Sequence, residues 1–359
     1  MSGRIHFIDW MKASGMFLIV YGHTSGHALF NPTLPVNLKQ IGVVFFVLAT
    51  GYLLADEKRP WPRVLFNRLF ELFLFGVGFS LLLSVINFFR IGDINESNYL
   101  PFALGLNVLF DAFPANSSTW YIGTYIHLLL LWAVVLRRIR VRPWMILLWL
   151  PIEVFLRAWL MDAFGDYVAY QALCNWLGIL LMGMYLGQRG VGDLGSESRR
   201  TLYGHLVGLV FAVAAWLWWV KGVGVTSSNP FGRLLIGTEG EQLAFTAASV
   251  SFVYFAWAYL GFQLLRHFKA GPFVRFLSRN SMLCFIFHMP LIKALTPLLY
   301  ALPGIDSPGL LRLAVNILIF YVGVSLVAEQ IRRFVAPARL KALAEQRFQS
   351  VQPARNSVR

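Results

Sequence analysis

Long apolar runs, separated by short polar breaks, make up most of this chain. The first run extends from Phe7 to Phe30 and is long enough to cross a bilayer, because a spanning helix needs about 20 mostly apolar residues. Applied between the breaks, this criterion predicts ten helices, at residues 7–29, 36–55, 64–89, 120–136, 143–161, 172–187, 202–220, 244–265, 278–300 and 310–331. The pattern therefore predicts an all-α, polytopic integral membrane protein with about ten transmembrane helices.

Composition supports this interpretation and sets an orientation. Of the 359 residues, 57% are hydrophobic and 13% are charged, whereas a soluble domain has about 25% charged residues. Together with Arg4 and the C-terminal tail, the loops after the second, fourth, sixth and eighth predicted helices put most of the 31 Lys and Arg residues on one side. Basic loops face the cytoplasm, so both termini are expected there, with membrane lipids and no nucleic acid as partners. Two cysteines in apolar runs indicate neither a disulfide framework nor a zinc site, and no metal is expected.

Three ionisable residues, Asp9, Lys12 and His23, interrupt the first apolar run. A Lys or Asp inside a spanning helix costs about 2.5 to 3.5 kcal/mol on insertion scales, so such residues tend to face a protein interior and to mark function. At about 100° and 1.5 Å per residue, the path from Lys12 to His23 makes about three turns and rises about 16 Å. Both side chains are therefore expected on one helix face, with Asp9 one turn before Lys12 and placed to neutralise it.

Other polar residues in the apolar runs fall into two groups by expected depth. The cytoplasmic group contains Arg68, Glu71 and Arg279. The group nearer the outside or the middle of the membrane contains Trp120, Glu153, Arg157 and His288. Glu153 and Arg157 are four residues apart, which makes them neighbours on one helix. Two depths of polar residues suit a reaction whose substrates arrive from opposite sides of the membrane.

Several phrases of the sequence match a known pattern. The chain opens with RIHFIDWMKA, places a His eleven residues beyond Lys12 within the phrase YGH, continues with FFVLATGYLL, and later holds NSMLCFIFHMPL around His288. In these phrases the sequence resembles the acyltransferase 3 family of integral membrane O-acyltransferases, which use acyl-CoA. The family's phrases read "R..LDWLRA", "FF.LSGYLL" and, late in the chain, "SY.IYL.H.P". The match spans most of the chain and is most specific at its opening.

The resemblance implies a membrane O-acetyltransferase that moves an acetyl group from acetyl-CoA to a hydroxyl of a bacterial surface polysaccharide or exopolysaccharide sugar. The carbohydrate acceptor would be lipid-linked or polymeric, the location would be the bacterial inner membrane, and polysaccharide-assembly proteins would be candidate partners. Residues 1–335 are then expected to form the membrane acyltransferase domain. Residues 336–359 are expected to form a frayed, basic cytoplasmic tail that touches anionic lipid.

Roles follow from the same resemblance. His23 is the candidate catalytic residue, as a base for the acceptor hydroxyl or as a carrier of the acyl group, and the sequence leaves both open. Lys12 and Asp9 are expected to act with it, unless they form a structural ion pair. The residues expected to bind the donor are Arg68, Arg63 and Arg279. The residues expected to bind the acceptor are Trp120, Glu153, Arg157 and His288. An ion pair that locks two helices explains Glu153 and Arg157 equally well, and Trp is common at membrane interfaces.

One position departs from the family's pattern. Many members carry an Arg three residues after the one that Arg68 matches, but the stretch FNRLFELF has Glu71 there. Arg59 and Arg63 lie upstream and are candidates to replace the lost positive charge. The departure leaves the donor-binding role of the third predicted helix open.

Two other functions remain open on the sequence. A transporter that moves a sugar or acyl carrier without chemistry would also place charges inside membrane helices, although the inverted repeats of many transporters are not visible here. A polysaccharide-assembly subunit that only binds would leave His23 replaceable. Within the acyltransferase class, transfer of succinyl or another acyl group would give a similar sequence.

Overall fold

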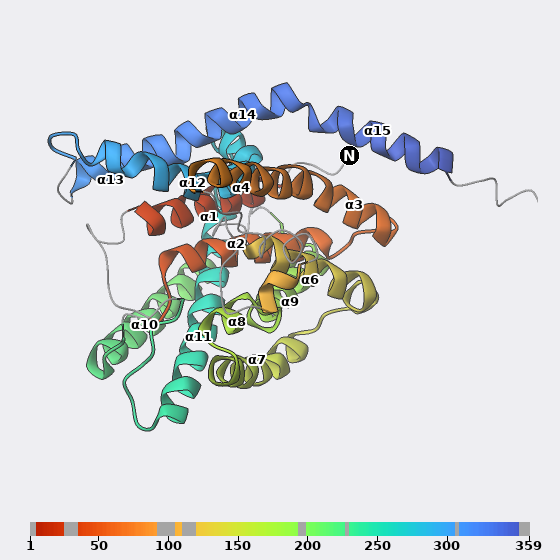
Figure 1. Ribbon diagram of the computed structural model, residues 1–359. Coiled ribbons are helices and arrows are strands. Elements are labelled where there is room, and N and C mark those ends of the chain that lie inside the picture. The colour runs from red at the N-terminus through yellow and green to blue at the C-terminus, as the bar shows by residue number, and fades with distance from the viewer. Residues whose placement is uncertain are drawn as a thin grey trace, which may run out of the picture.

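The computed structural model describes residues 5–24, 35–91, 105–109, 120–192, 199–226, 230–305 and 309–351. Over these ranges the chain is helical, with an isolated bridge between Val225 and Leu234, so the predicted all-α class is confirmed (Figure 1). The helices of the first half are α1 (His6–Thr24), α2 (Leu38–Leu54), α3 (Trp61–Leu72), the π-helical η1 (Phe73–Val77), α4 (Gly78–Ile91), the 3-10 helix η3 (Leu106–Leu109), α6 (Trp120–Val134), the 3-10 helix η4 (Leu136–Arg138) and α7 (Pro143–Ala163). Those of the second half are α8 (Asp166–Gln171), α9 (Cys174–Gln188), α10 (Arg199–Val223), α11 (Glu239–Leu265), α12 (Pro272–Leu299), α13 (Leu310–Ile317), the π-helical η5 (Leu318–Gly323), α14 (Val324–Val335) and α15 (Pro337–Val351).

Several helices begin where the sequence provides a start signal. α7 and α12 open on Pro143 and Pro272, whose fixed φ angle and missing N–H suit the first helical position. α11 begins with a capping box, in which the main-chain N–H of Thr238 donates to Glu241 at 2.6 Å. α7 starts where the sequence predicted, at residue 143, whereas α11 and α12 start five and six residues before the predicted starts at 244 and 278.

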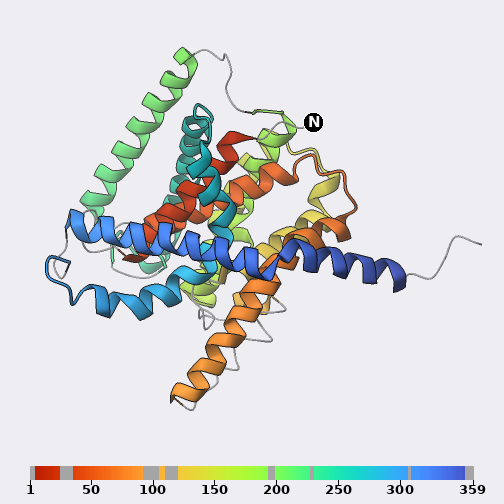
Figure 2. The same cartoon turned by 90° about the horizontal axis from the view of Figure 1, so that it is seen from above.

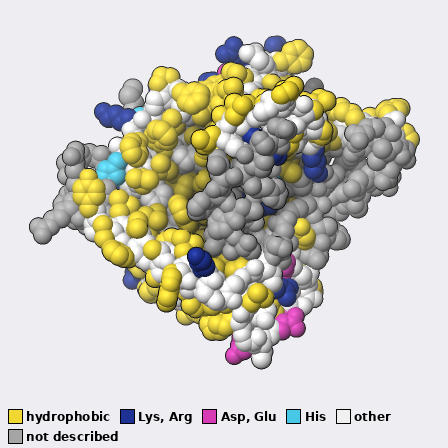
Figure 3. Space-filling model, turned by 90° about the vertical axis from the view of Figure 1, so that its left-hand side faces the viewer, with side chains coloured by type: hydrophobic (Ala, Val, Ile, Leu, Met, Phe, Trp, Pro, Cys, Tyr) yellow, Lys and Arg dark blue, Asp and Glu magenta, His cyan; other side chains and the backbone are white. Residues whose placement is uncertain are grey.

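The protein is a multi-pass membrane protein. Within the described ranges, eight helical spans are long and apolar enough to cross a membrane. Large apolar side chains such as Phe211 and Trp218 of α10 are exposed, and apolar side chains cover much of the face seen in Figure 3. α10 lies at the edge of the bundle and packs on α11 (Figure 2). The exact number of spans and the cytoplasmic position of the termini stay predictions.

α2 forms the centre of the bundle, with α1 packed on one side and α9 on the other. Glycines permit both contacts. A Cβ atom on Gly15 of α1 would lie 2.8 Å from the main-chain oxygen of Gly42 on α2. On the other side, a Cβ on Gly51 of α2 or Gly183 of α9 would overlap a main-chain oxygen of the facing helix. Small residues at helix contacts let backbones approach closely in membrane proteins, and here they allow α1 to pack tightly against α2.

α12 packs against α1 and α14, so helices from the two ends of the chain lie side by side (Figure 1). Tyr321 of η5 donates a hydrogen bond to the main-chain oxygen of Ala13 at 2.6 Å. The main-chain oxygen of Thr24 accepts hydrogen bonds from Tyr300 at 3.2 Å and from Asn316 at 3.3 Å. The carboxyl end of α1, which carries His23, is therefore held in place by the C-terminal helices.

The C-terminal tail differs from its expected form. In place of a frayed segment, α15 continues to Val351, because its sequence is rich in strong helix formers such as Ala, Leu and Arg. Ala336, with a φ of 46°, separates α14 from α15. The division of the chain into domains at this point stays a prediction. Arg4, His27, most of the loop between residues 92 and 119, and residues 352–359 lie outside the described residues; within that loop, η3 packs against α6 and α8.

Candidate functional site

The candidate site is built on a pair of histidines from α1 and α12. His23 lies in the last turn of α1, and His288 lies within α12. Their ring centres are 5.3 Å apart, with an angle of 51° between the ring planes. The sequence had placed each of them in a matching phrase of its own, and the fold brings them together.

The hydrogen bonds of His288 identify its reactive nitrogen. Its Nδ1 lies 2.9 Å from the main-chain oxygen of Phe285 and 3.1 Å from that of Cys284. A carbonyl oxygen can only accept, so Nδ1 must carry the proton and donate it. In the neutral ring Nε2 is then an acceptor, and it is buried without a hydrogen-bond partner among the described residues. His288 thus holds a lone pair ready to accept a proton.

The surroundings of His23 carry positive charge. Lys39 of α2 and Lys293 of α12 lie close enough to His23 to act on its charge, as does His288. Lys293 itself is exposed at the surface of the described structure. Cations in this position would favour an anion, or an oxygen that gains negative charge during a reaction.

A cavity of about 170 Å³ lies between α1, α2, α3, α6 and α12. Its polar lining residues are Lys12, Thr50, Arg68, Tyr121, Tyr125 and Ser281. Its remaining walls are mostly apolar and include Phe46, Phe285 and Ile286. The ring of Phe285 lies 6.0 Å from that of His288, so the cavity reaches the neighbourhood of the pair. A long ligand with a charged end and a less polar body would fit such a lining.

The polar face that the sequence predicted on α1 lies along this region. Lys12 lines the cavity. Asp9 is buried and accepts a hydrogen bond from Ser278 of α12 at 2.7 Å. Arg68 also lines the cavity and donates to the hydroxyl of Tyr125 at 3.4 Å. Lys12 and Arg68 therefore line one cavity, whereas His23 is not among its lining residues.

The other two arginines expected to bind the donor lie outside the cavity. Arg63 is exposed on α3. Arg279 is more than half exposed and forms an ion pair with Glu329 of α14 at 2.9 Å. Arg59, considered as a replacement for the lost arginine, donates to Glu57 at 2.5 Å, and this pairing lowers the pKa of the Glu57 carboxyl to about 2. None of these three side chains lines the cavity described above.

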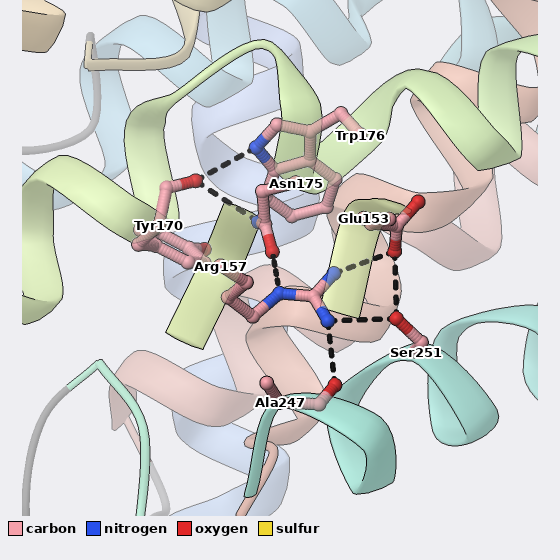
Figure 4. A network of polar contacts seen from close by, with 7 residues as sticks. All are labelled: Glu153, Arg157, Tyr170, Asn175, Trp176, Ala247 and Ser251. Carbon is pink, nitrogen blue, oxygen red and sulfur yellow. Dashed lines mark hydrogen bonds and ion pairs between the residues drawn. The ribbon is translucent and has the colours of Figure 1, made fainter. Parts of the chain in front are cut away.

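Glu153 and Arg157 form the centre of a buried polar network that joins α7, α9 and α11 (Figure 4). Ser251 of α11 donates to Glu153 at 2.8 Å. Arg157 donates to Glu153 at 2.6 Å, to the side chain of Asn175 at 2.6 Å, to the main-chain oxygen of Ala247 at 2.6 Å and to Ser251 at 2.7 Å. These hydrogen bonds explain the Glu153–Arg157 pair as a structural contact that holds α7, α9 and α11 together. Neither residue lines the cavity, and contact with a sugar stays a prediction.

Trp120 is also enclosed by protein. It is 6% exposed and packs in an aromatic cluster, with ring centres 4.5 Å from Tyr170 and 5.8 Å from Trp176. Its neighbour Tyr121 is the residue of this turn that lines the cavity. Stacking of a sugar on Trp120 stays a prediction.

Some contacts near the site were missed by the sequence interpretation. Tyr125 lines the cavity one helical turn beyond Tyr121, a spacing that puts both on one face of α6. Glu71 forms an ion pair with Arg332 of α14 at 2.7 Å. The Tyr spacing is a local signal that was available, whereas the ion pair joins positions distant in the sequence.

Within the described ranges, no three His, Cys, Asp or Glu side chains gather as a metal site would require.

Comparison with known proteins gives one match. A family model described as "Acyltransferase domain" matches residues 5–329. A search of curated proteins and a search of solved structures each found no match. The matched span includes both histidines and every residue that lines the cavity.

Proposed function

Because this chain belongs to the acyltransferase 3 family, we propose that it is an O-acetyltransferase that moves an acetyl group from acetyl-CoA to a hydroxyl of a bacterial surface polysaccharide or exopolysaccharide sugar. The acceptor would be lipid-linked or polymeric. The enzyme would lie in the bacterial inner membrane, near polysaccharide-assembly proteins. The observation that carries the proposal is the partner-free Nε2 of His288, which lies beside His23 and next to a cavity lined by cations.

The cavity supports a place for the donor. Acetyl-CoA carries several phosphates on one end and a long arm that ends in the thioester. Lys12 and Arg68 suit the anionic end, since ammonium and guanidinium groups bind phosphate oxygens strongly. The apolar walls near Phe285 suit the arm. In this arrangement the thioester would approach the histidine pair while the phosphates stay at the far end of the cavity.

The transfer step needs a base because a sugar hydroxyl is almost fully protonated at neutral pH. The hydroxyl oxygen attacks the thioester carbonyl carbon, and its proton passes to an unprotonated imidazole nitrogen. The carbon–sulfur bond then breaks, and the sulfur leaves as a thiolate that takes a proton to give the free thiol of coenzyme A. Lys39 and Lys293 lie where they would offset the charge that develops on the carbonyl oxygen.

Two reaction routes that use the histidine pair are consistent with this transfer of the acetyl group and the proton. In the first, His23 removes the proton as the hydroxyl attacks and passes it to Nε2 of His288 beside it. In the second, His23 takes the acetyl group from the thioester, and the sugar hydroxyl then removes it, with His288 receiving the proton. Both routes use the bare Nε2 of His288.

The test is the acetyl content of the host's extracellular polysaccharide, measured by proton NMR in a strain that lacks this protein. The strain is complemented with the native chain, with His23→Ala, or with the control His127→Ala on α6, at equal membrane abundance. The proposal expects the native chain and the control to restore the acetyl signal and His23→Ala to leave it absent. Restoration by His23→Ala would rule out this mechanism. A change in polymer export with no change in acetylation would point to transport.

A further inference from the structure

Glu71 of α3 and Arg332 of α14 form an ion pair at 2.7 Å, and Arg68 lies one helical turn from Glu71 on the same helix. Residues three apart on a helix have neighbouring side chains. Arg68 therefore lies on the same helix as Glu71, and the ion pair of Glu71 brings Arg332 of α14 to that helix. Arg332 lies beyond the span 5–329 that the family model matches.

Both guanidinium groups have an unused donor. The Nε atoms of Arg68 and Arg332 are buried, and neither has a hydrogen-bond partner among the described residues. Buried donors in folded proteins are almost always satisfied, so an orphaned N–H indicates a missing acceptor. Two such donors on neighbouring guanidinium groups call for a ligand with several acceptor oxygens. A phosphate group has that form and the complementary charge.

The charges around this place favour an anion. The carboxylate of Glu329 pairs with Arg279 at 2.9 Å and with Arg333 at 3.4 Å, and that of Glu71 pairs with Arg332. Arg68 lies one turn from Glu71 on α3 and donates to Tyr125, so these elements carry four guanidinium groups and two carboxylates. Arg68 also lines the cavity assigned above to the donor. A bound phosphate at this position would therefore continue directly into that cavity.

We propose that Arg332 and Arg68 together form a phosphate-binding site for the coenzyme A part of the donor, with Glu71 holding Arg332 in position. The inference rests on the proposed function, because coenzyme A supplies the phosphate. It also accounts for the departure at position 71. Arg332 of α14 supplies the positive charge that α3 lacks at position 71, and Glu71 holds the Arg332 guanidinium beside α3.

The test measures binding of coenzyme A itself, by calorimetry, to the purified full chain in lipid nanodiscs. Arg332→Gln is expected to weaken binding about 10-fold or more, since hydrogen bonds to charged groups are the strong ones. The decisive variant is Glu71→Arg combined with Arg332→Gln, which moves the guanidinium to α3 and abolishes the ion pair. This double variant is expected to recover most of the lost affinity. Arg339→Gln, on the exposed surface of α15, controls for charge alone and should bind as the native chain does.

Each outcome has a separate meaning. If the native chain does not bind coenzyme A, the proposed donor is wrong. If the native chain binds and Arg332→Gln binds equally well, the phosphate site is overturned while the proposed function stands. If the double variant remains folded, by gel filtration and thermal unfolding, but stays as weak as Arg332→Gln, Glu71 and Arg332 are only a structural pair and the inference is overturned.

Discussion

The ring of His288 faces that of His23 at 5.3 Å between centres, with Nδ1 of His288 committed to two carbonyl oxygens of its own helix. The main-chain oxygens of the helix therefore fix the tautomer of His288, with the proton on Nδ1. Nε2 is then the ring nitrogen that can accept a proton from the substrate. The relationship gives the second histidine a chemical role that its position in the sequence did not specify.

Replacing His288 with Asn should abolish transfer without loosening the fold. The amide of Asn can still donate within the protein, but it has no basic nitrogen. General-base groups contribute about 10²- to 10⁴-fold to a rate, so acetyl transfer should fall by that order. The measurement is polysaccharide acetyl content by proton NMR at matched membrane abundance, with His127→Asn on α6 as control. A His288→Asn variant with acetylation close to native would exclude the lone pair from the reaction.

Removing the hydroxyl of Ser278 should destabilise the contact between α1 and α12. Ser278 donates to the buried carboxylate of Asp9 at 2.7 Å. Loss of a donor to a buried charged group costs about 1–3 kcal/mol. Ser278→Ala should therefore lower the unfolding temperature in detergent. The matched control is Ser281→Ala, whose hydroxyl donates only to the main-chain oxygen of Ser278 in the same helix. Equal shifts in the two variants would show that the bond to Asp9 contributes nothing special.

Breaking the Glu153–Arg157 pair should be a stability defect. Removing one partner leaves the other charged and buried, which costs about 3–5 kcal/mol. Arg157→Met should therefore unfold at a clearly lower temperature than the native chain. The double variant Glu153→Leu with Arg157→Met should recover part of the loss, because no charge is then stranded. An Arg157→Met chain with native thermal stability but no acetyl transfer would support contact with the sugar instead.

A larger side chain at Gly183 should separate α9 from α2. A Cβ atom there would already overlap the main-chain oxygen of Leu48. Overpacking a close contact costs about 1–3 kcal/mol or more, so Gly183→Leu should reduce both membrane abundance and unfolding temperature. The control is Gly208→Leu on α10, where a Cβ would meet nothing within 4 Å. Similar losses in the two variants would mean that close packing of α2 and α9 is not the cause.

Much of the fold could be predicted because membrane helices obey a local rule. Length and apolarity fix where a helix can cross the bilayer, and Pro143 marks the predicted start of α7. Pro272 starts α12 six residues before the predicted start at 278. The form of the tail could not be read in this way. Residues after Pro337 lack an apolar face, yet their helix propensity is enough to form α15.

The site could be predicted only as far as one helix extends. The period of α1 predicted Lys12 and His23 on one face; in the structure Lys12 lines the cavity and His23 pairs with His288. Contacts between distant helices carry no such periodic signal. The sequence alone made Glu71 look like a lost arginine, because its partner Arg332 lies 261 residues away.

The packing of α1 against the C-terminal helices also sets an order for biosynthesis. α1 leaves the ribosome long before the groups that bind it, Ser278 at Asp9 and Tyr300 and Asn316 at Thr24, are translated. Until then the newly inserted α1 lacks these partners in the membrane. The histidine pair thus forms only after α12 is made, and a nascent chain that stalls before α12 contains one of its two histidines.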